Sequence, residues 1–197
     1  MRKPRKMILG FLVLGLILGV GVTQTGMNYS KNSSTVVAHA DDNINATDQG
    51  MIGDGKTDNA PMLQKILDDT KNEDNVTIHV PKGNYLFTNA ELNAIVLHSH
   101  ITFDFDKDAV FQIAHGDRMA FVYPSPNAGY DGGISYVNWN NATFRGDYTQ
   151  DDGQSVFVQS INHAQHVNFN GCTFDNDESP TGQYIDIDGI QDVNIEN

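Results

Sequence analysis

An alternation of apolar and small polar residues recurs along this chain. It is clearest from Val137 to Phe144, it returns over residues 167–174, and it begins again over residues 193–197. A period of two is that of a β-strand with one buried face. After the alternating residues, each copy has an Asn or Gly, and these residues tolerate a left-handed backbone. The pattern therefore predicts short strands that end in sharp turns.

The spacing of these copies favours a solenoid. Val137, Val167 and Val193 are separated by 30 and 26 residues, and earlier apolar runs that start at Ile78 and Ile101 fit the same scheme. A coil of a parallel β-helix needs roughly 20 to 30 residues, so the unequal gaps indicate loops of different length. The longest gap contains a Pro- and Gly-rich segment, residues 123–133, that we interpret as a projecting loop. The predicted fold class is all-β, a right-handed parallel β-helix of about four to five coils. Unrelated strands of a sandwich are the alternative.

An amphipathic helix is predicted before the first coil. A glycine-rich turn leads to Thr57 or Asp58 as the helix cap, and Pro61 is acceptable in the first turn. A helix here would close the apolar end of the solenoid. We do not interpret the glycines as a phosphate loop, because no strand precedes them in a βαβ context. The residues with helical spacing are Ala60, Leu63, Ile66, Leu67 and Thr70.

Residues 1–40 have the composition of a secretory signal peptide. Four positive charges precede residue 7, an apolar run extends from Met7 to Val22, and Ala38, His39 and Ala40 form a small-x-small exit. We expect cleavage after Ala40, which would leave a secreted domain of residues 41–197. A retained membrane anchor is the alternative, although 16 apolar residues fall short of the roughly 20 that span a bilayer.

The predicted secreted domain is strongly acidic. The chain has 25 Asp and Glu against 12 Lys and Arg, and five of the basic residues lie before residue 41, which leaves a net charge of −18. Such a charge repels nucleic acids and anionic membranes, so neither is an expected partner. The single cysteine, Cys172, cannot form an intrachain disulfide. Its place in the repeat matches that of Ala142, which predicts a small buried residue.

Two short motifs near the start carry a family resemblance. They are the run Gly53 to Asn59, continued by Leu63-Gln64 and Ile66-Leu67, and the run Val80 to Tyr85. Together they resemble the start of the pectate-lyase-like superfamily of right-handed parallel β-helices, which includes pectate lyases, polygalacturonase-like glycosidases and phage tailspikes. The resemblance implies this fold and a polysaccharide ligand. It leaves the reaction open, because such folds host lyases, hydrolases, epimerases and non-catalytic adhesins.

A polar stripe is predicted along one side of the solenoid. In residues 101–105 the apolar side chains face inward, so Thr102, Asp104 and Asp106 point outward. In-register coils about 4.8 Å apart would extend this stripe from coil to coil. Such a stripe suits the hydroxyl groups of a sugar chain. A solvated outer face without a ligand is the alternative. No metal ligands are assigned, because the run 104–108 lacks the Gly and Glu of a calcium-binding EF-hand loop. The further stripe residues are Asn138, Asn140, Asn168, Asn170, Asn194 and Glu196.

The candidate catalytic residues are Asp186, Asp188 and Arg145. The two aspartates alternate with inward Ile185 and Ile187, which places their carboxylates on one face, roughly 6.5 to 7 Å apart, a separation that suits glycosidases once the side chains move. Residues 187–190 faintly resemble the Asn-Thr-Asp-Gly-Ile element of polygalacturonase-like glycosidases, which implies a catalytic Asp188. The Asn-Thr pair is absent from this element, and that family's Asp-Asp, Gly-His-Gly and Arg-x-Lys elements do not follow it before residue 197.

Arg145 is a candidate because of the resemblance to lyases of this superfamily. The catalytic base of those lyases is commonly Arg or Lys, and a nearby acidic site binds calcium. Calcium is therefore a possible cofactor only for a lyase. Two histidine pairs, His98 with His100 and His163 with His166, lack a third ligand, so we interpret them as loop or coil-edge residues.

The predicted function is that of a secreted, polysaccharide-associated domain that cleaves or binds an extracellular glycan. A non-catalytic surface adhesin or glycan-binding module is the alternative. An acidic cleft around Asp186 and Asp188 would favour the enzyme, and a flat Asn and Thr stripe would favour the binder. The last repeat stops before the residues that match Ala142 to Phe144, so we expect a truncated solenoid. Such a chain would be inactive alone and would self-associate through its open end.

Overall fold

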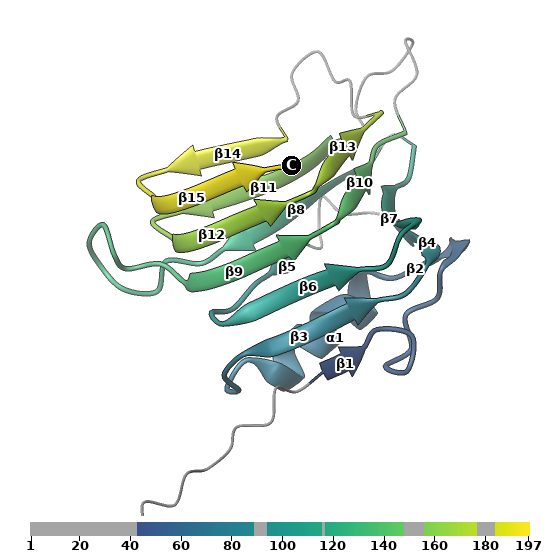
Figure 1. Ribbon diagram of the computed structural model, residues 1–197, viewed down its shortest axis with the longest axis horizontal. Helices are drawn as coiled ribbons and strands as arrows, with labels where there is room; N and C mark the ends of the chain where they lie inside the picture. Colours follow the sequence, from purple (N-terminus) through teal and green to yellow (C-terminus); the bar gives the residue numbers. More distant parts are fainter. Residues whose placement is uncertain (1–42, 89–93, 116, 148–155, 177–183) are drawn as a thin grey trace, which may run out of the picture. The chain divides into compact units, whose positions relative to one another are not determined.

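Strands of successive coils pair in parallel and form three sheets (Figure 1). The computed structural model describes residues 43–88, 94–115, 117–147, 156–176 and 184–197. Sheet A contains β1 (Asn43–Asn45), β3 (Val76–Val80), β6 (Ile101–Phe105), β9 (Ser135–Asn140), β12 (Gln165–Asn170) and β15 (Gln191–Glu196). Sheet B contains β2 (Asp54–Asp58), β4 (Gly83–Phe87), β7 (Ala109–Ile113), β10 (Thr143–Arg145) and β13 (Thr173–Asp175). Sheet C contains β5 (Ile95–Val96), β8 (Arg118–Tyr123), β11 (Val156–Asn162) and β14 (Ile185–Asp188).

From β3 onward, the chain passes from sheet A to sheet B to sheet C in each coil, so the fold is a mostly β parallel solenoid of about four coils. This confirms the solenoid predicted from the repeat. The Pro- and Gly-rich segment separates β8 from β9 and projects beyond the sheets in Figure 1. The predicted signal peptide lies outside the described residues. Within the described parts of the chain, no helix has the length and apolar character needed to cross a membrane.

The register of sheet A follows the predicted repeat in all but the first copy. Val137 pairs with Ile101 on one side and with Val167 on the other, and Val167 pairs with Val193. The predicted start at Ile78 was wrong by two residues, because Val76 is the residue that pairs with Ile101. A shift of two keeps the same side chains facing inward, so an alternating pattern alone cannot detect it.

The core is a stack of aromatic rings, one coil above another. The rings of Phe103 and Trp139 lie parallel with centroids 4.1 Å apart. The indole Nε1 of Trp139 donates to the Tyr123 hydroxyl at 2.9 Å, and that hydroxyl donates to Oε1 of Gln159 at 3.0 Å. This buried chain of polar groups satisfies hydrogen bonds that would otherwise be lost in the core. Burial also raises the pKa of Tyr123 far above its usual value.

Helix α1 (Ala60–Thr70) packs the side chains of Leu63, Ile66 and Leu67 into this core. Gln64 lies against the edge of β5: its Oε1 accepts from the backbone N–H of Val96 at 2.8 Å, and its Nε2 donates to the Val96 carbonyl at 3.4 Å. The side-chain amide thus takes the place of a neighbouring strand at this edge. Helix α1 confirms the short helix that was predicted near the start of the chain.

The N-cap of this helix is Asn59, and not Thr57 or Asp58 as predicted. The Asn59 side chain is occupied elsewhere and makes no capping bond. It is buried and bonds to the backbone of Ile52, Thr57 and Leu86, which ties the glycine-rich turn to β4. The side chain of Asp58 supplies the nearby acceptor for the backbone N–H of Ala60, at 3.1 Å.

Candidate functional site

The outer face of sheet A carries three columns of aligned polar side chains. They run across the strands, one residue per coil, because the coils keep the same register. The first column, just before the strand core, contains Asn75, His100, Tyr136, His166 and Asp192. The second contains Thr77, Thr102, Asn138, Asn168 and Asn194. The third contains His79, Asp104, Asn140, Asn170 and Glu196.

Side-chain hydrogen bonds join neighbouring coils in the second and third columns. Nδ2 of Asn138 donates to Oγ1 of Thr102 at 3.2 Å, and Nδ2 of Asn168 donates to Oδ1 of Asn138 at 2.7 Å. Nδ2 of Asn170 donates to Oδ1 of Asn140 at 3.0 Å. The stripe residues predicted from the sequence therefore lie together on one face, with Asp104 beside Asn140. Their role in binding stays a prediction.

The first column is a stack of rings that the sequence reasoning missed. The Tyr136 ring lies between the imidazoles of His100 and His166, with centroids 5.0 and 4.6 Å apart. Nδ1 of His166 lies 3.2 Å from a carboxylate oxygen of Asp192. All five column residues have positive φ, between 53° and 61°, a conformation that bulky residues rarely adopt. Their sequence signal was available, because each residue directly precedes the first inward Val or Ile of its strand.

Three hollows lie on or beside this face. The first, of about 530 Å³, lies between the first two columns, and the second, of about 340 Å³, adjoins β1. The third, of about 770 Å³, lies at the turn from sheet A into sheet B. The first is lined by Asn75, Thr77, His100, Thr102, Tyr136 and Asn138. The second is lined by Asn43, Ile44, Asn45, Thr77, His79 and Asp104, and the third includes Lys82, Asp106, Lys107 and Arg145.

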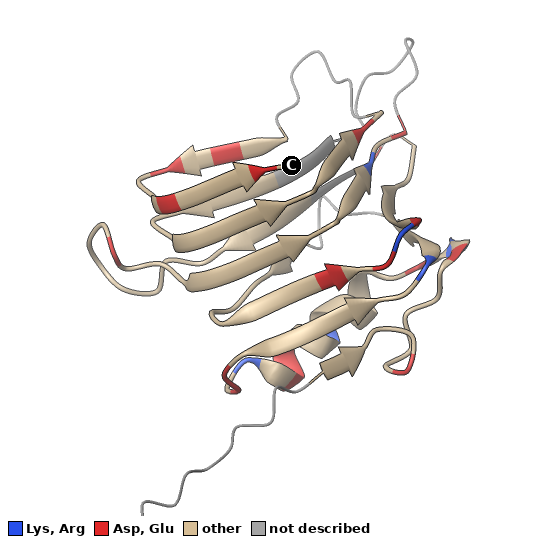
Figure 2. Ribbon diagram, in the orientation of Figure 1, with Lys and Arg blue, Asp and Glu red and all other residues tan. Residues whose placement is uncertain are grey.

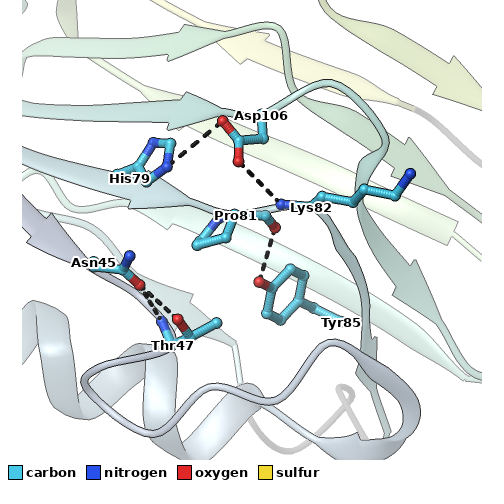
Figure 3. Close-up of polar contacts among 7 residues, drawn as sticks. All are labelled: Asn45, Thr47, His79, Pro81, Lys82, Tyr85 and Asp106. Carbon is cyan, nitrogen blue, oxygen red and sulfur yellow. Dashed lines mark hydrogen bonds and ion pairs between the residues drawn. The ribbon is translucent and has the colours of Figure 1, made fainter.

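Asp106 lines the third hollow and contacts His79, which lines the second; Figure 3 shows its polar contacts. One of its carboxylate oxygens lies 3.6 Å from Nε2 of His79, and the other accepts from the backbone N–H of Lys82 at 3.3 Å. Nζ of Lys82 in turn forms an ion pair with Asp108 at 3.1 Å. The predicted stripe residue Asp106 thus lies beyond the end of β6, where it links the two sheets.

Charge is sparse on the strands of sheet A (Figure 2). The acidic residues on these strands are Asp104 on β6 and Asp192 and Glu196 on β15. Lys82, Lys107 and Arg145 gather at the third hollow. Uncharged amides and hydroxyls therefore dominate the middle of the face.

The three candidate catalytic residues do not lie on one sheet. Asp186 and Asp188 are exposed on the outer face of β14 in sheet C, where they pair with Ser160 and Asn162 of β11. Arg145 lies on β10 of sheet B, and its Nε forms an ion pair with Asp175 at 2.8 Å. The structure brings the two aspartates together, as predicted, and leaves Arg145 on another side of the solenoid.

Two inward positions near these residues are incompletely covered. Ile187 aligns with the buried Ile161 but is 45% exposed, because, within the described residues, β14 is the last strand of sheet C. Cys172 is half-buried, and its Sγ contacts the Trp139 carbonyl at 3.3 Å. Burial raises the pKa of the Cys172 thiol, which favours the unreactive protonated form.

The donor set for a metal is sparse in the part of the chain that the structure describes. No group of three or more His, Cys, Asp or Glu side chains is arranged there to hold an ion. Asp106 and Asp108, which belong to the run that suggested calcium, contact His79 and Lys82. Both carboxylates thus contact groups of the chain at this turn.

The fold and its motifs define a pectate-lyase-like β-solenoid domain. The chain belongs to the family described as rhamnogalacturonase A/epimerase, pectate lyase-like, whose model matches residues 43–197. This confirms the family resemblance of the two N-terminal motifs. No protein with a curated description matches the chain significantly.

Two solved structures are similar to the chain. The chain is similar to PfbA, a surface adhesin of Streptococcus pneumoniae, with a TM-score of 0.60 and 18% identity over 78% of this chain. A protein of Geobacillus virus E2, ORF18, gives a TM-score of 0.49 and 18% identity over 75% of the chain. The chain spans only 37% and 27% of these two proteins, respectively. At this identity the likeness concerns the fold alone.

Proposed function

We propose that this protein is a secreted module that binds an extracellular polysaccharide through the outer face of sheet A. The observation that carries the proposal is the hydrogen-bonded ladder of Thr102, Asn138 and Asn168 beside the ring stack centred on Tyr136. Amides and hydroxyls both donate and accept hydrogen bonds, as sugar hydroxyls do. A face of this kind offers complementary partners to a glycan.

The ladder leaves binding capacity free on each amide. Nδ2 of Asn138 has two hydrogens and uses one on Thr102, and its Oδ1 has two lone pairs and uses one on Asn168. One donor and one acceptor therefore remain for a ligand. Because the ladder already fixes the rotamers, less side-chain entropy is lost on binding than for free surface residues.

Three features support an extracellular polysaccharide as the partner. The family name refers to rhamnogalacturonan-active proteins, and one structural neighbour is a surface adhesin. The basic and apolar start of the chain has the pattern of a secretory signal.

The proposal takes the solenoid as right-handed, the hand of nearly all crossovers between parallel strands. It takes α1 as the cap of the first coil, since the helix buries the core and satisfies the β5 edge.

Glycan cleavage is the second candidate function. The supporting observation is the pair of exposed carboxylates, Asp186 and Asp188, on the outer face of sheet C. Arg145 would serve a different site, since it lies on sheet B and pairs with Asp175. Binding is the better supported function, because the ladder face needs no residue from another sheet.

Affinity electrophoresis and calorimetry with rhamnogalacturonan, polygalacturonate and dextran test the proposal. We expect the wild type to bind at least one of them and Thr102→Ala to weaken that binding about tenfold. Thr173→Ala, the same change on the outer face of sheet B, is the matched control and should bind as the wild type does. Release of reducing ends or unsaturated products that Asp186→Asn abolishes would establish the enzyme instead.

A further inference from the structure

The three hollows lie one after another in a path across sheet A. The first and second share Thr77 of β3, and His79, which lines the second, contacts Asp106, which lines the third. The path follows β3 and β6 from the ring stack to the turn into sheet B. From Asn75 to Pro81 there are six residue-to-residue steps, or about 20 Å of extended strand, which is long enough for several sugar units.

The path lies beside β3 and β6 because the side chains of the second column are shorter there. The second column has Thr77 and Thr102 at β3 and β6, and asparagines at β9, β12 and β15. Threonine is shorter than asparagine, so the face recedes beside these two strands. The first hollow lies there, between the threonines and the edge of the Tyr136 ring.

The polar groups along the path change in kind from one end to the other. Imidazole and phenol groups of His100 and Tyr136 line its start, and the hydroxyl groups of Thr77 and Thr102 line its middle. At its far end, the third hollow adds the ammonium group of Lys107. The path thus offers a sugar chain a series of donors and acceptors in the direction of the strands.

We propose that the bound glycan lies along β3 and β6, across the solenoid, and not along its axis over the asparagine ladders. This inference rests on the proposed function and assigns the site of that binding to the three hollows. Asn168 and Asn170 would then serve mainly to hold the face in shape, because their Nδ2 atoms donate to Asn138 and Asn140. Thr77, common to two hollows, becomes the central residue of the site.

Thr77→Gln tests the path by filling both hollows that share this residue. The probes are size-graded rhamnogalacturonan and dextran oligosaccharides, and the measurement is calorimetry, with the melting temperature of each variant as a check of folding. We expect Thr77→Gln to lower the affinity for the bound probe at least about tenfold. Thr173→Gln is the matched control on sheet B and should keep the wild-type affinity.

Asn168→Gln separates the two orientations. A glycan along the axis would contact this residue, so its affinity would fall at least as much as in Thr77→Gln. The path across the strands predicts a smaller loss, below about threefold. A Thr77→Gln variant that binds like the wild type, or an Asn168→Gln variant that loses as much affinity, would overturn the path and leave the proposed function standing. A wild type that binds no probe would overturn both.

Discussion

Asn59 is the residue whose removal most directly tests how the N-terminal motif works. Its side chain is 1% exposed. Oδ1 accepts from the backbone N–H of Ile52 at 2.7 Å, and Nδ2 donates to the carbonyls of Ile52, Thr57 and Leu86 at 3.1, 2.8 and 3.2 Å. The variant Asn59→Ala leaves these backbone groups without partners. The motif behind the family resemblance is therefore expected to be structural.

The expected loss follows from counting hydrogen bonds. One bond to Oδ1 and one for each of the two Nδ2 hydrogens make about three, at about 1 kcal/mol each, so Asn59→Ala should destabilise the fold by about 3 kcal/mol. That is a large fraction of the 5 to 15 kcal/mol typical of a domain. Urea unfolding followed by circular dichroism should show a midpoint lowered by about 1 to 2 M.

A matched control and a near-isostere sharpen this test. Asn45 also accepts three hydrogen bonds, two from Thr47 and one from Asp48, but at a solvent-exposed turn. Asn45→Ala should therefore cost less than about 1 kcal/mol. Asn59→Asp keeps the acceptor for Ile52 and turns a carboxylate oxygen toward three carbonyls, so it should be worse than Asn59→Ala at neutral pH and recover in acid. Equal midpoints for Asn59→Ala and the wild type would refute this account of the motif.

Four further outcomes are expected. Leu63→Asp should lower the melting temperature of the whole solenoid, because a charge would enter the core without a partner; an unchanged melting temperature would mean that α1 does not close the first coil. Burial lowers the pKa of His98 below 6.5, so the folded state binds fewer protons than the unfolded state, and stability should fall as pH drops below 6.5. His98→Gln should reduce this dependence of stability on pH, as measured by unfolding curves in acid. A pH dependence equal to that of the wild type would assign the effect to other groups. Sequencing of the secreted protein should find Asp41 at its N-terminus, and an intact start in the membrane fraction would indicate an anchor. Ile187 and Ile195 are 45% and 58% exposed, so light scattering should show concentration-dependent association that Ile195→Asp reduces. A monomeric mass at every concentration would contradict this prediction.

The sequence predicted those features that repeat. Alternation fixed which residues face inward, and the spacing of Val137, Val167 and Val193 gave the register of the later coils. It could not fix the first coil, because a slip of two residues preserves the inward pattern. The stripe of Asn138 and Asn168 was predicted because polar residues at alternating positions of aligned strands must share a face.

The rest of the candidate site depends on three-dimensional detail that alternation does not encode. The ring stack escaped prediction because His100 and Tyr136 have positive φ, which strand periodicity does not indicate. Arg145 was grouped with Asp186 by chemistry, yet the solenoid turns a corner between sheet B and sheet C and separates them. Hollows depend on differences in side-chain length between coils, as with Thr77 and Asn138.

The ladder contacts make one coil interchangeable with the next. Between the coil that starts at β9 and the coil that starts at β12, they join residues 30 positions apart, as in Asn138 with Asn168 and Gly146 with Asn176. An in-frame duplication of such a segment, after the coil of β9, would meet matching partners on both sides. It would lengthen the solenoid by about 4.8 Å and leave the hollows over β3 and β6 unchanged. Gene duplication could therefore alter the length of such a protein without altering what it recognises.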